Sequence, residues 1–403
     1  MPRDIVVLGA GYSGINCVVR LNKLLKKNPD YQIHLVDRNP YHLLETRLHE
    51  AAARQAEITI PIAAIIHKRN IVFHLAEVLK ITLNEKKVVT LDKNISYDYL
   101  VIALGSKTNF YDIPGLKEYA FQLKTFEDTY KIRDNLKRAF AKAKSETNPE
   151  ERKKLLTIVI GGGGLTGVEL AAEIAELVGE LSHKWEIPPE GPQIYLIEAG
   201  ETILPAVEKK IIDKAQENLI QKKVKILTST KVIKMEPGAV HIEPGGKIPT
   251  YTLIWTGGIR ISSILKASGL EVGPLGRIKV NQFLEVENFP NVYAVGDNAL
   301  AVNPKTGKYV PCAAQFALQQ GRLVANNIYA KINGKPQKPY RQKVLGEVIS
   351  LGRHLTLGWL ALPGNKKLSF FGFLANLLKR MVAEKHLFLL WKESRHWVRA
   401  QGY

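Results

Sequence analysis

Three glycines near the N-terminus have the spacing of a phosphate-binding loop. Gly9, Gly11 and Gly14 follow the apolar run 5–8 as G-x-G-x-x-G, and residues 15–25 continue with a helical pattern. In this arrangement the first glycine allows a tight turn, the second lets the backbone approach a pyrophosphate, and the third lets the helix pack on the strand. The N-terminal N–H groups of the helix would then point toward the phosphates. The stretch therefore predicts a dinucleotide site.

The same pattern occurs a second time in the middle of the chain. Gly162, Gly164 and Gly167 follow the apolar run 156–160 with the same spacing, and residues 168–181 form the next helical pattern. One glycine pattern alone is a weak signal, but a second strand, glycine and helix unit in one chain is much less expected by chance. The repeat predicts two related domains that bind two dinucleotides, a flavin and a nicotinamide.

An acidic residue ends the second strand of each unit. Asp37 follows the predicted strand 32–36, and Glu198 follows the predicted strand 193–197. A carboxylate at this position accepts hydrogen bonds from ribose hydroxyls and repels the 2′-phosphate of NADPH. No arginine lies directly after Glu198 to bind that phosphate. The second unit is therefore expected to prefer NADH, unless Glu198 is an unrelated surface acid.

Glycine also follows three other apolar strands. The candidates are Gly105 after residues 97–104, Gly258 after residues 251–256, and Gly296 after residues 288–295. At the carboxyl edge of a parallel sheet such positions contact ligands, although each could also be a plain turn. Asp297 comes directly after Gly296 and could bind the ribityl hydroxyls of a flavin.

The chain of 403 residues is long enough for two or three domains, and its charge is strongly positive. Lys and Arg number 57 against 38 Asp and Glu, which gives a formal net charge of +19. Such a surface favours polyanions, either nucleic acid or an anionic membrane. A solvated basic surface without such a partner is the alternative.

The cysteines and histidines form no metal or disulfide pattern. Cys17 and Cys312 are the two cysteines, and they form no C-x-x-C or C-x-x-x-x-C pair. A dithiol redox centre, a zinc site and a disulfide scaffold are therefore unsupported, and Cys17 is expected to be a buried thiol in the first helix. His42 and His49 have no partner at metal-ligand spacing, so both are predicted to be core or surface histidines. No metal is expected.

The C-terminal tail has the pattern of a membrane-surface anchor. In residues 368–381 the large apolar side chains fall on one helical face, and an aromatic and basic block follows at 386–399. This pattern suits an amphipathic helix that lies in an anionic membrane surface, with a core-facing helix as the alternative. The N-terminus leaves no room for a signal peptide, and no apolar run reaches the ~18–20 residues of a spanning helix. A peripheral protein on the cytoplasmic face of the cell membrane is expected.

These motifs, in this order, resemble those of the type II NADH:quinone oxidoreductases, which are flavoproteins with two dinucleotide-binding domains. The most specific match is residues 314–321, which are similar to the family's A-Q-x-A-x-Q-x-G segment beside the isoalloxazine and the quinone tunnel. Gln315 and Gln319 lie one helical turn apart, so both amides can point at one ligand. One departure is Cys312, because the family often has a second proline at this position after Pro311.

The resemblance implies a role for each candidate residue. It implies catalytic roles for Glu169, Gln315 and Gln319, of which Glu169 matches a family acid near the flavin and the nicotinamide. The residues implied to bind FAD are Gly9, Gly11, Gly14, Asp37, Gly105, Gly296, Asp297, Ala314 and Gln315. Those implied to bind NADH are Gly162, Gly164, Gly167, Glu198 and Gly258.

The expected fold is α/β, with two Rossmann-like dinucleotide-binding domains and a C-terminal amphipathic helical region that anchors to a membrane. The predicted bounds are 1–115 and 275–365 for a discontinuous FAD domain, 116–274 for the NADH domain, and 366–403 for the membrane-association region. The resemblance implies hydride transfer from NADH to FAD, then transfer of two electrons to a membrane quinone, without proton pumping. The implied partners are NADH, a membrane quinone and an anionic membrane surface. A homodimer is left open, and no specific nucleic acid is expected.

Three other functions share parts of this pattern. A sulfide:quinone reductase has the same fold and tail but needs a pair of redox cysteines, for which Cys17 and Cys312 are poor candidates. A soluble pyridine-nucleotide flavoprotein reductase would share the glycine loops but would not need the apolar, basic tail. An NADH-sensing flavoprotein that binds DNA would account for the charge of +19, yet the sequence has no motif that reads nucleic acid.

Overall fold

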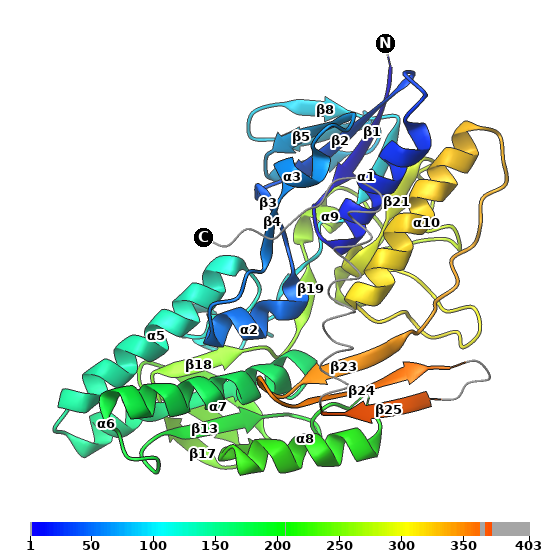
Figure 1. The fold of residues 1–403 in the computed structure, drawn as a ribbon. Coiled ribbons are helices and arrows are strands. Elements are labelled where there is room, and N and C mark those ends of the chain that lie inside the picture. The colour runs from blue at the N-terminus through cyan, green and yellow to red at the C-terminus, as the bar shows by residue number, and fades with distance from the viewer. Residues whose placement is uncertain (1, 206, 363–366, 373–403) are drawn as a thin grey trace.

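The chain is organised as two halves, each built around a five-stranded parallel sheet. The computed structural model describes residues 2–205, 207–362 and 367–372. Figure 1 shows the first half at the top, the second half below it, and a small antiparallel sheet beside the second half.

The sheet of the first half has the strand order β21–β9–β1–β2–β5. Its strands are β1 (Arg3–Leu8), β2 (Tyr31–Asp37), β5 (Ile71–Leu75), β9 (Tyr99–Ile102) and β21 (Val292–Ala294). Val7 of β1 packs in the core that holds α1 (Tyr12–Leu25) and α10 (Ala314–Ile332), whereas Val6 packs in a second core on the other face. Both faces of the sheet are covered, which is why its strands are continuous apolar runs.

The sheet of the second half repeats this arrangement in the order β11–β18–β12–β13–β14. Its strands are β11 (Phe121–Gln122), β12 (Thr157–Gly161), β13 (Gln193–Ile197), β14 (Val224–Leu227) and β18 (Thr252–Trp255). Helices α5 (Phe126–Ser145) and α7 (Leu165–Trp185) share one core with this sheet. By position, β12 corresponds to β1 and β13 to β2. In both halves the glycine loop follows the central strand, where a doubly wound sheet binds its ligand.

The other face of each parallel sheet is covered by a small antiparallel sheet. In the first half this sheet contains β6 (Val78–Thr82), β7 (Lys87–Thr90) and β8 (Asn94–Ser96), and in the second half it contains β15 (Lys231–Glu236), β16 (Ala239–Glu243) and β17 (Gly246–Pro249). The repeat of the parallel sheet therefore extends to the layer that covers it.

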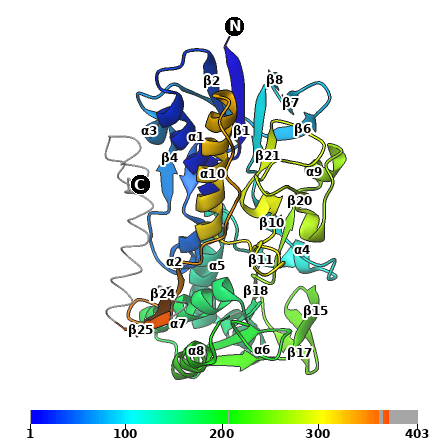
Figure 2. The same cartoon turned by 90° about the vertical axis from the view of Figure 1, so that its right-hand side faces the viewer.

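Two connections hold the halves together. Helix α2 (Leu48–Ala53) belongs to the first part of the chain but packs against α5 and α7. Strand β10 (Ser106–Thr108) pairs with β19 (Ile259–Ile261) in antiparallel register. Helix α10 returns to the first half and lies along α1 (Figure 2).

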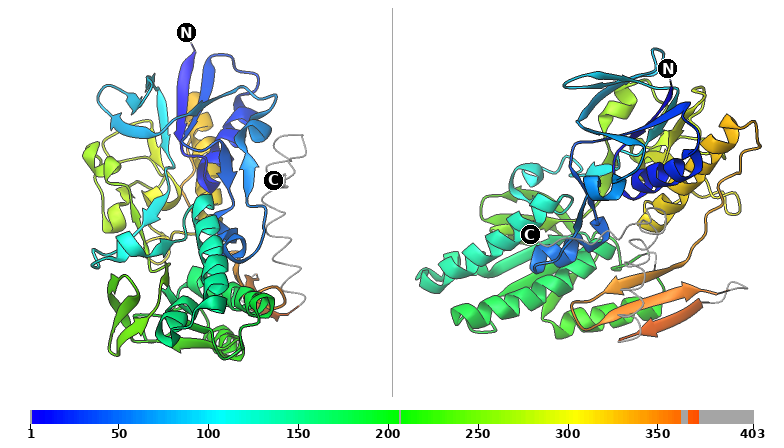
Figure 3. Two further views of the ribbon diagram at one scale, coloured as in Figure 1. Left: turned by 90° about the vertical axis from the view of Figure 1, so that its left-hand side faces the viewer. Right: turned by 45° about the horizontal axis from the view of Figure 1, so that its top comes forward.

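A further antiparallel sheet corrects one prediction for the tail. Strands β23 (Gly346–Ser350), β24 (Thr356–Ala361) and β25 (Lys367–Phe371) form it, and it packs against α7 and α8 (Lys209–Gln221), as Figure 3 shows from two sides. The helix predicted from residue 368 is wrong for 368–371, because these residues pair with β24 from Leu360 to Leu357. Backbone pairing with a neighbouring strand overrides the helical spacing of the apolar residues. The rest of the predicted helix lies outside the described residues.

The remaining elements are short. The helical ones are η1 (Glu45–Arg47), α3 (Ile62–Ile66), α4 (Leu116–Tyr119), α6 (Pro149–Leu156), α9 (Ser263–Ala267), η2 (Pro274–Gly276) and η3 (Gly296–Asn298). The strands are β3 (Tyr41–Leu43), β4 (Thr59–Pro61), β20 (Ile278–Lys279) and β22 (Ala299–Leu300). Within the described residues, no helix combines the length and the hydropathy needed to cross a membrane. The predicted domain bounds stay a prediction.

Candidate active site

The first glycine loop joins β1 to α1 and contains two packed glycines and one open glycine. Gly9 has φ of +100°, and a Cβ there would lie 2.1 Å from the carbonyl oxygen of Ala103. A Cβ on Gly14 would lie 1.8 Å from the carbonyl oxygen of Gly9, so helix and strand meet there without room for a side chain. A Cβ on Gly11 would have no atom within 4 Å. Open space at Gly11, beside the N-terminus of α1, fits a pyrophosphate.

The second glycine loop, between β12 and α7, has the same geometry. Gly162 has φ of +106°, and a Cβ on Gly167 would lie 1.8 Å from the carbonyl oxygen of Gly162. A Cβ on Gly164 would again have no atom within 4 Å. Both loops therefore fit the roles that the sequence predicts for their glycines, and each is open at its middle glycine.

The two predicted acids hold these loops in the same way. The N–H of Ala10 donates to Oδ2 of Asp37 (2.6 Å), and the N–H of Gly163 donates to Oε2 of Glu198 (2.6 Å). In each case the second oxygen accepts from the N–H two residues further along the chain, at 2.7 Å. Burial raises the pKa of Asp37, although the hydrogen bonds from the backbone N–H groups of Ala10 and Asn39 act to lower it. Each acid thus lies beside its own loop.

His42 binds the other backbone group of Ala10 in the first loop. Its Nδ1–H donates to the carbonyl oxygen of Ala10 (2.7 Å), because a carbonyl can only accept. The ring is fully buried, and burial lowers the pKa of His42 to about 4, so the ring is neutral at pH 7. Of the two alternatives predicted for His42, core or surface, the structure shows the core one. In the second loop a backbone group replaces the ring, since the N–H of Leu204 donates to the carbonyl oxygen of Gly163 (2.8 Å).

Asp297 lies next to the turn that follows β9. The hydroxyl of Ser106 donates to Oδ2 of Asp297 (2.6 Å). The side chain of Asn298 is fully buried and bonds both the N–H and the carbonyl of Gly105, at 3.0 and 2.9 Å. These bonds link the segments that follow β9 and β21, two strands that are far apart in the sequence and each lead to a glycine. One oxygen of the Asp297 carboxylate is held by the hydroxyl of Ser106.

Gly296 is held by α10. The N–H of Gly296, which has φ of +65°, donates to Oε1 of the buried Gln320 (2.7 Å). A Cβ on Gly321 would lie 2.1 Å from the carbonyl oxygen of Ser13, so α10 packs directly against the start of α1. Sequence reasoning missed Gln320, as it missed Ser106 and Asn298. Each of these three residues comes directly after a candidate that the sequence did indicate. An amide or hydroxyl side chain directly after a candidate residue is the signal that could have found them.

Gln315 and Gln319 bind the backbone of the segment before β23. The amide of Gln319 donates from Nε2 to the carbonyl of Lys343 (2.8 Å) and accepts from the N–H of Lys343 (3.0 Å). The amide of Gln315 donates to the carbonyl of Gly346 (3.3 Å) and accepts from the N–H of Leu345 (3.1 Å). The two amides thus lie on one helical face, as expected, and they pair with this segment as a neighbouring strand would.

A cleft lies between the halves. Leu48 and Thr108 line it from the first half, and Thr166, Thr256 and Gly258 line it from the second half. Thr166 belongs to the first turn of α7, two residues after the open glycine of the second loop. The cleft therefore lies where a ligand on the second loop meets the first half.

An ion pair crosses this cleft. Lys124 donates from Nζ to Oε2 of Glu45 (2.7 Å), and both side chains line the cleft. Glu45 comes from η1 of the first half, and Lys124 lies directly before α5. Neither residue was predicted from the sequence, because nothing in their local spacing indicates a pair.

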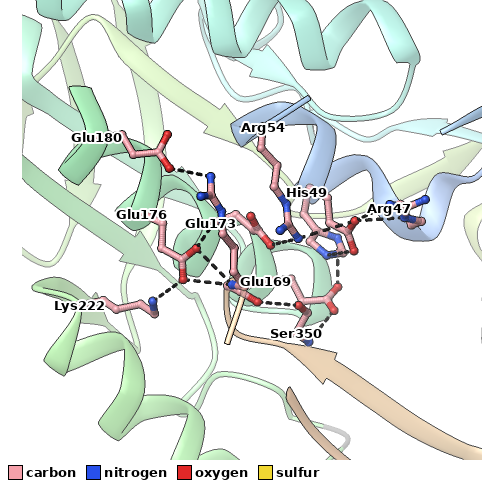
Figure 4. A network of polar contacts seen from close by, with 12 residues as sticks. Arg47, His49, Arg54, Glu169, Glu173, Glu176, Glu180, Lys222 and Ser350 are labelled. Carbon is pink, nitrogen blue, oxygen red and sulfur yellow. Dashed lines mark hydrogen bonds and ion pairs between the residues drawn. The ribbon is translucent and has the colours of Figure 1, made fainter. Parts of the chain in front are cut away.

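Glu169 lies in the second turn of α7 and is held from two sides (Figure 4). Its Oε1 accepts from the N–H of Ser350 (2.9 Å), and its Oε2 lies 3.4 Å from Nδ1 of the buried His49 on α2. On the same side of α7, Oε1 of Glu173 accepts from Nη2 of Arg54 (2.9 Å). Arg54 also lies within 3.7 Å of Glu50. The junction thus carries alternating acidic and basic groups from both halves.

The two cysteines lie in different places and form no disulfide. Cys17 is fully buried in α1, where burial raises the pKa of its thiol, so the predicted buried thiol is confirmed. Burial, with the nearby charge of Asp297, raises the pKa of Cys312 to about 11. Both thiols are therefore protonated at neutral pH. In the described part of the chain, no group of three or more His, Cys, Asp or Glu side chains could hold a metal ion.

Comparisons of sequence agree with this geometry. A family model described as pyridine nucleotide-disulphide oxidoreductase matches residues 3–321. A type II NADH:quinone oxidoreductase from Staphylococcus haemolyticus is 32% identical over 362 residues, which cover 88% of this chain and 89% of that protein. A protein of the same name from Staphylococcus saprophyticus is 29% identical over 362 residues with the same coverage.

Solved structures show the same fold. NDH2 from Plasmodium falciparum in complex with NADH matches with a TM-score of 0.85 and 22% identity, and the match covers 100% of both chains. The sulfide:quinone oxidoreductase of Aquifex aeolicus matches with a TM-score of 0.78 and 20% identity, over 97% of this chain and 92% of that one. The architecture of two dinucleotide-binding halves is therefore shared by proteins of different chemistry.

Proposed function

This chain belongs to the pyridine nucleotide-disulphide oxidoreductase family and, within it, to the type II NADH:quinone oxidoreductases, and from that membership we propose that it oxidises NADH and reduces a quinone with FAD as its resident cofactor. The observation that carries the proposal is the duplicated loop, in which Gly11 and Gly164 face open space beside a helix N-terminus. Two such loops give the chain one site for the flavin dinucleotide and one for the nicotinamide dinucleotide.

FAD would be held by the first half. Gly9, Gly11, Gly14 and Asp37 would bind its adenosine and pyrophosphate. The groups at its flavin end would be Gly105, Gly296, Asp297, Ala314 and Gln315. When bound, FAD supplies the redox chemistry, since it takes a hydride from NADH and passes two electrons to the quinone. The role of this half is to position that group.

NADH would be held by the second half. Gly162, Gly164 and Gly167 would carry its pyrophosphate, and Gly258 lines the cleft that its nicotinamide would enter. The carboxylate of Glu198 would accept from the 2′-hydroxyl of the adenosine ribose and repel a 2′-phosphate. This charge is our reason to propose NADH in preference to NADPH as the donor.

Glu169 would transfer a proton at the junction of the halves. Oxidation of NADH by a quinone consumes one proton from solvent, so a titratable group must pass it on. Glu169 has one oxygen held by the N–H of Ser350 and the other near Nδ1 of His49, which leaves its carboxyl oriented. A positioned carboxyl of this kind can give or take a proton at Oε2. We propose no pumping, and only the proton used in the reaction would move.

Gln315 and Gln319 would form part of the quinone site. Each amide nitrogen carries two N–H bonds, and one of them bonds the segment 343–346. The second N–H of each amide is the donor proposed for a quinone carbonyl. A sulfide:quinone reductase is not favoured, since the thiols of Cys17 and Cys312 form no pair.

We propose that the surface around α8 and β25 attaches to an anionic membrane, on the cytoplasmic face of that membrane. Lys210 and Lys214 of α8 place Nζ 5.5 and 4.5 Å from the ring centroid of Phe371. The formal net charge of +19 adds a long-range attraction to anionic lipid. The predicted anchoring region at 366–403 begins at this surface with β25, and such an attachment would bring the site close to a quinone dissolved in the bilayer.

Anaerobic stopped-flow spectroscopy of the purified holoenzyme tests the proposal. We expect NADH, but not NADPH, to bleach the oxidised flavin band, and a short-chain quinone to restore it. Glu198→Gln is the matched variant, and it should lose part of the discrimination against NADPH because the repelling charge is gone. A flavin that sulfide bleaches, or that a quinone does not reoxidise, would contradict the proposed function.

A further inference from the structure

The ammonium group of Lys124 is fixed in the cleft between the two halves. Its backbone N–H donates to Oδ2 of Asp128 (3.0 Å), within the capping box of Thr125 that starts α5. Its side chain is 19% exposed, and its Nζ donates to Oε2 of Glu45 on the other half. The charge is therefore placed by a helix terminus on one side and by a carboxylate on the other.

The charges around Lys124 keep it positive. Burial acts to lower the pKa of Lys124, but the carboxylates of Glu45 and Asp297 outweigh burial and raise it. Cys312 is the other group that acts on Lys124, and its raised pKa of about 11 keeps it neutral at pH 7. At neutral pH the cleft thus contains a protonated lysine within electrostatic range of the residue proposed to hold the ribityl chain.

A positive charge of this kind would stabilise a reduced flavin. Two-electron reduction at neutral pH leaves the isoalloxazine as an anion, with its negative charge around N1 and the C2 carbonyl. Under the proposed function Asp297 would hold the ribityl chain, and the isoalloxazine attached to that chain would lie toward the cleft. A cation in a partly buried cleft acts more strongly on such a charge than it would in water.

We propose that Lys124 stabilises the negative charge of the reduced flavin and that Glu45 is a positioning residue that holds Lys124 and offsets part of its charge. This inference rests on the proposed function, because it requires FAD in the first half. It assigns to an ion pair across the two halves the electrostatic control of the flavin.

Two substitutions separate this role from a structural one. Lys124→Met and Glu45→Gln break the same ion pair, so a merely structural role predicts that both change the flavin in the same direction. An electrostatic role predicts opposite directions, since Lys124→Met removes a positive charge and Glu45→Gln removes a negative one. Lys124→Arg keeps the charge and is the conservative control.

The probe is sulfite, titrated into the oxidised holoenzyme and followed by flavin absorbance. Sulfite forms a bond from its sulfur electron pair to flavin N5 and leaves a negative charge on the flavin, so its affinity reports the local potential without turnover. We expect Lys124→Met to raise the sulfite Kd about tenfold, Glu45→Gln to lower it several-fold, and Lys124→Arg to leave it near the wild-type value. Shifts in the same direction for Lys124→Met and Glu45→Gln, or no shift in either, would overturn the inference.

Controls keep this outcome distinct from failure of the proposed function. Wild-type protein without FAD, or with a flavin that NADH does not bleach, would contradict the proposed function and this inference with it. If Lys124→Met fails to retain FAD, Glu45→Gln still decides by its sign. A tighter sulfite complex supports the electrostatic role, and a weaker one contradicts it.

Discussion

His49 of the first half and Glu169 of the second half meet at the junction, with 3.4 Å between Nδ1 and Oε2. The imidazole is buried on α2, and the carboxylate lies one turn into the helix that follows the second glycine loop. The contact links α2, which packs against the NADH half, to the acid that is proposed to transfer the proton. Its position gives the first prediction.

Replacing Glu169 by Gln should lower turnover with NADH and quinone by about a hundredfold, because an amide still accepts from the N–H of Ser350 but cannot carry a proton. Flavin absorbance should show that FAD is retained. Glu217→Gln, at an exposed position on α8, is the matched control and should keep wild-type turnover. Loss of FAD from Glu169→Gln would contradict the proposed role.

Alanine at the two open glycines should separate the two cofactors. A Cβ at Gly11 or Gly164 meets no protein atom, so neither change should prevent folding, but each places a methyl group where a pyrophosphate would lie. We expect Gly11→Ala to lose FAD on purification, and Gly164→Ala to keep FAD while its KM for NADH rises about tenfold or more.

Gly179→Ala is the control for these two variants, since its Cβ also meets nothing but lies within α7. It should keep FAD content and KM unchanged. If Gly164→Ala lost FAD and Gly11→Ala did not, the assignment of the two loops would be reversed.

Acid should destabilise the protein through His42. The pKa of this buried ring is lowered from 6.5 to about 4, so between these values the unfolded chain binds a proton that the folded chain does not. The free energy of unfolding should therefore fall as pH drops from 6.5 to 4, with a slope of up to about 1.4 kcal/mol per pH unit from this group. Chemical unfolding at several pH values measures the slope, which His42→Gln should reduce. If His42→Gln and the wild type had the same slope, the pKa of His42 would not be lowered by burial.

Gln319→Ala should loosen the segment before β23. The substitution removes both side-chain hydrogen bonds to the backbone of Lys343. The loss of two such bonds is expected to raise the exchange rate of the Lys343 N–H by at least about tenfold. Hydrogen exchange measures this rate, with the N–H of Ser350 as an internal reference. Flavin reduction by NADH should be unchanged and reoxidation by quinone slower. If flavin reduction by NADH and reoxidation by quinone both kept their wild-type rates, Gln319 would not be part of the quinone site.

Charge reversal on α8 should weaken binding to anionic vesicles. Lys210→Glu with Lys214→Glu is expected to lower the partition coefficient roughly tenfold or more, since each basic residue near the surface contributes about 1 kcal/mol. Vesicle co-sedimentation measures the coefficient. Lys131→Glu with Lys137→Glu changes the net charge equally at exposed positions of α5, and it should have a smaller effect. Equal effects would indicate that only net charge matters.

Much of the site could be predicted because its signals are local. The tight turn at Gly9 and the contact of Gly14 with Gly9 involve residues a few positions apart, so their requirement for glycine is visible in the sequence. The acid at the end of the second strand is also local, since strand length and helix length place it beside the loop. Asp37 and Glu198 were found in this way.

The parts that were missed, or predicted wrongly, depend on partners that are distant in the sequence. That Gln315 and Gln319 face a ligand stays a prediction, whereas only the fold shows that their amides also bind residues 343–346. The strand at 367–371 has apolar residues that also suit a helix, and pairing with β24 decides between the two.

The sequence by itself determined two dinucleotide loops, their acids and the apolar strands that carry them, because backbone sterics and strand and helix periods act over short stretches. The tertiary structure decided which side chains meet across the two halves. Lys124 reaches Glu45 across 79 positions of the chain, and His49 reaches Glu169, because α2 and η1 lie against the second half. Such contacts follow from the packing of whole elements, which no local pattern records.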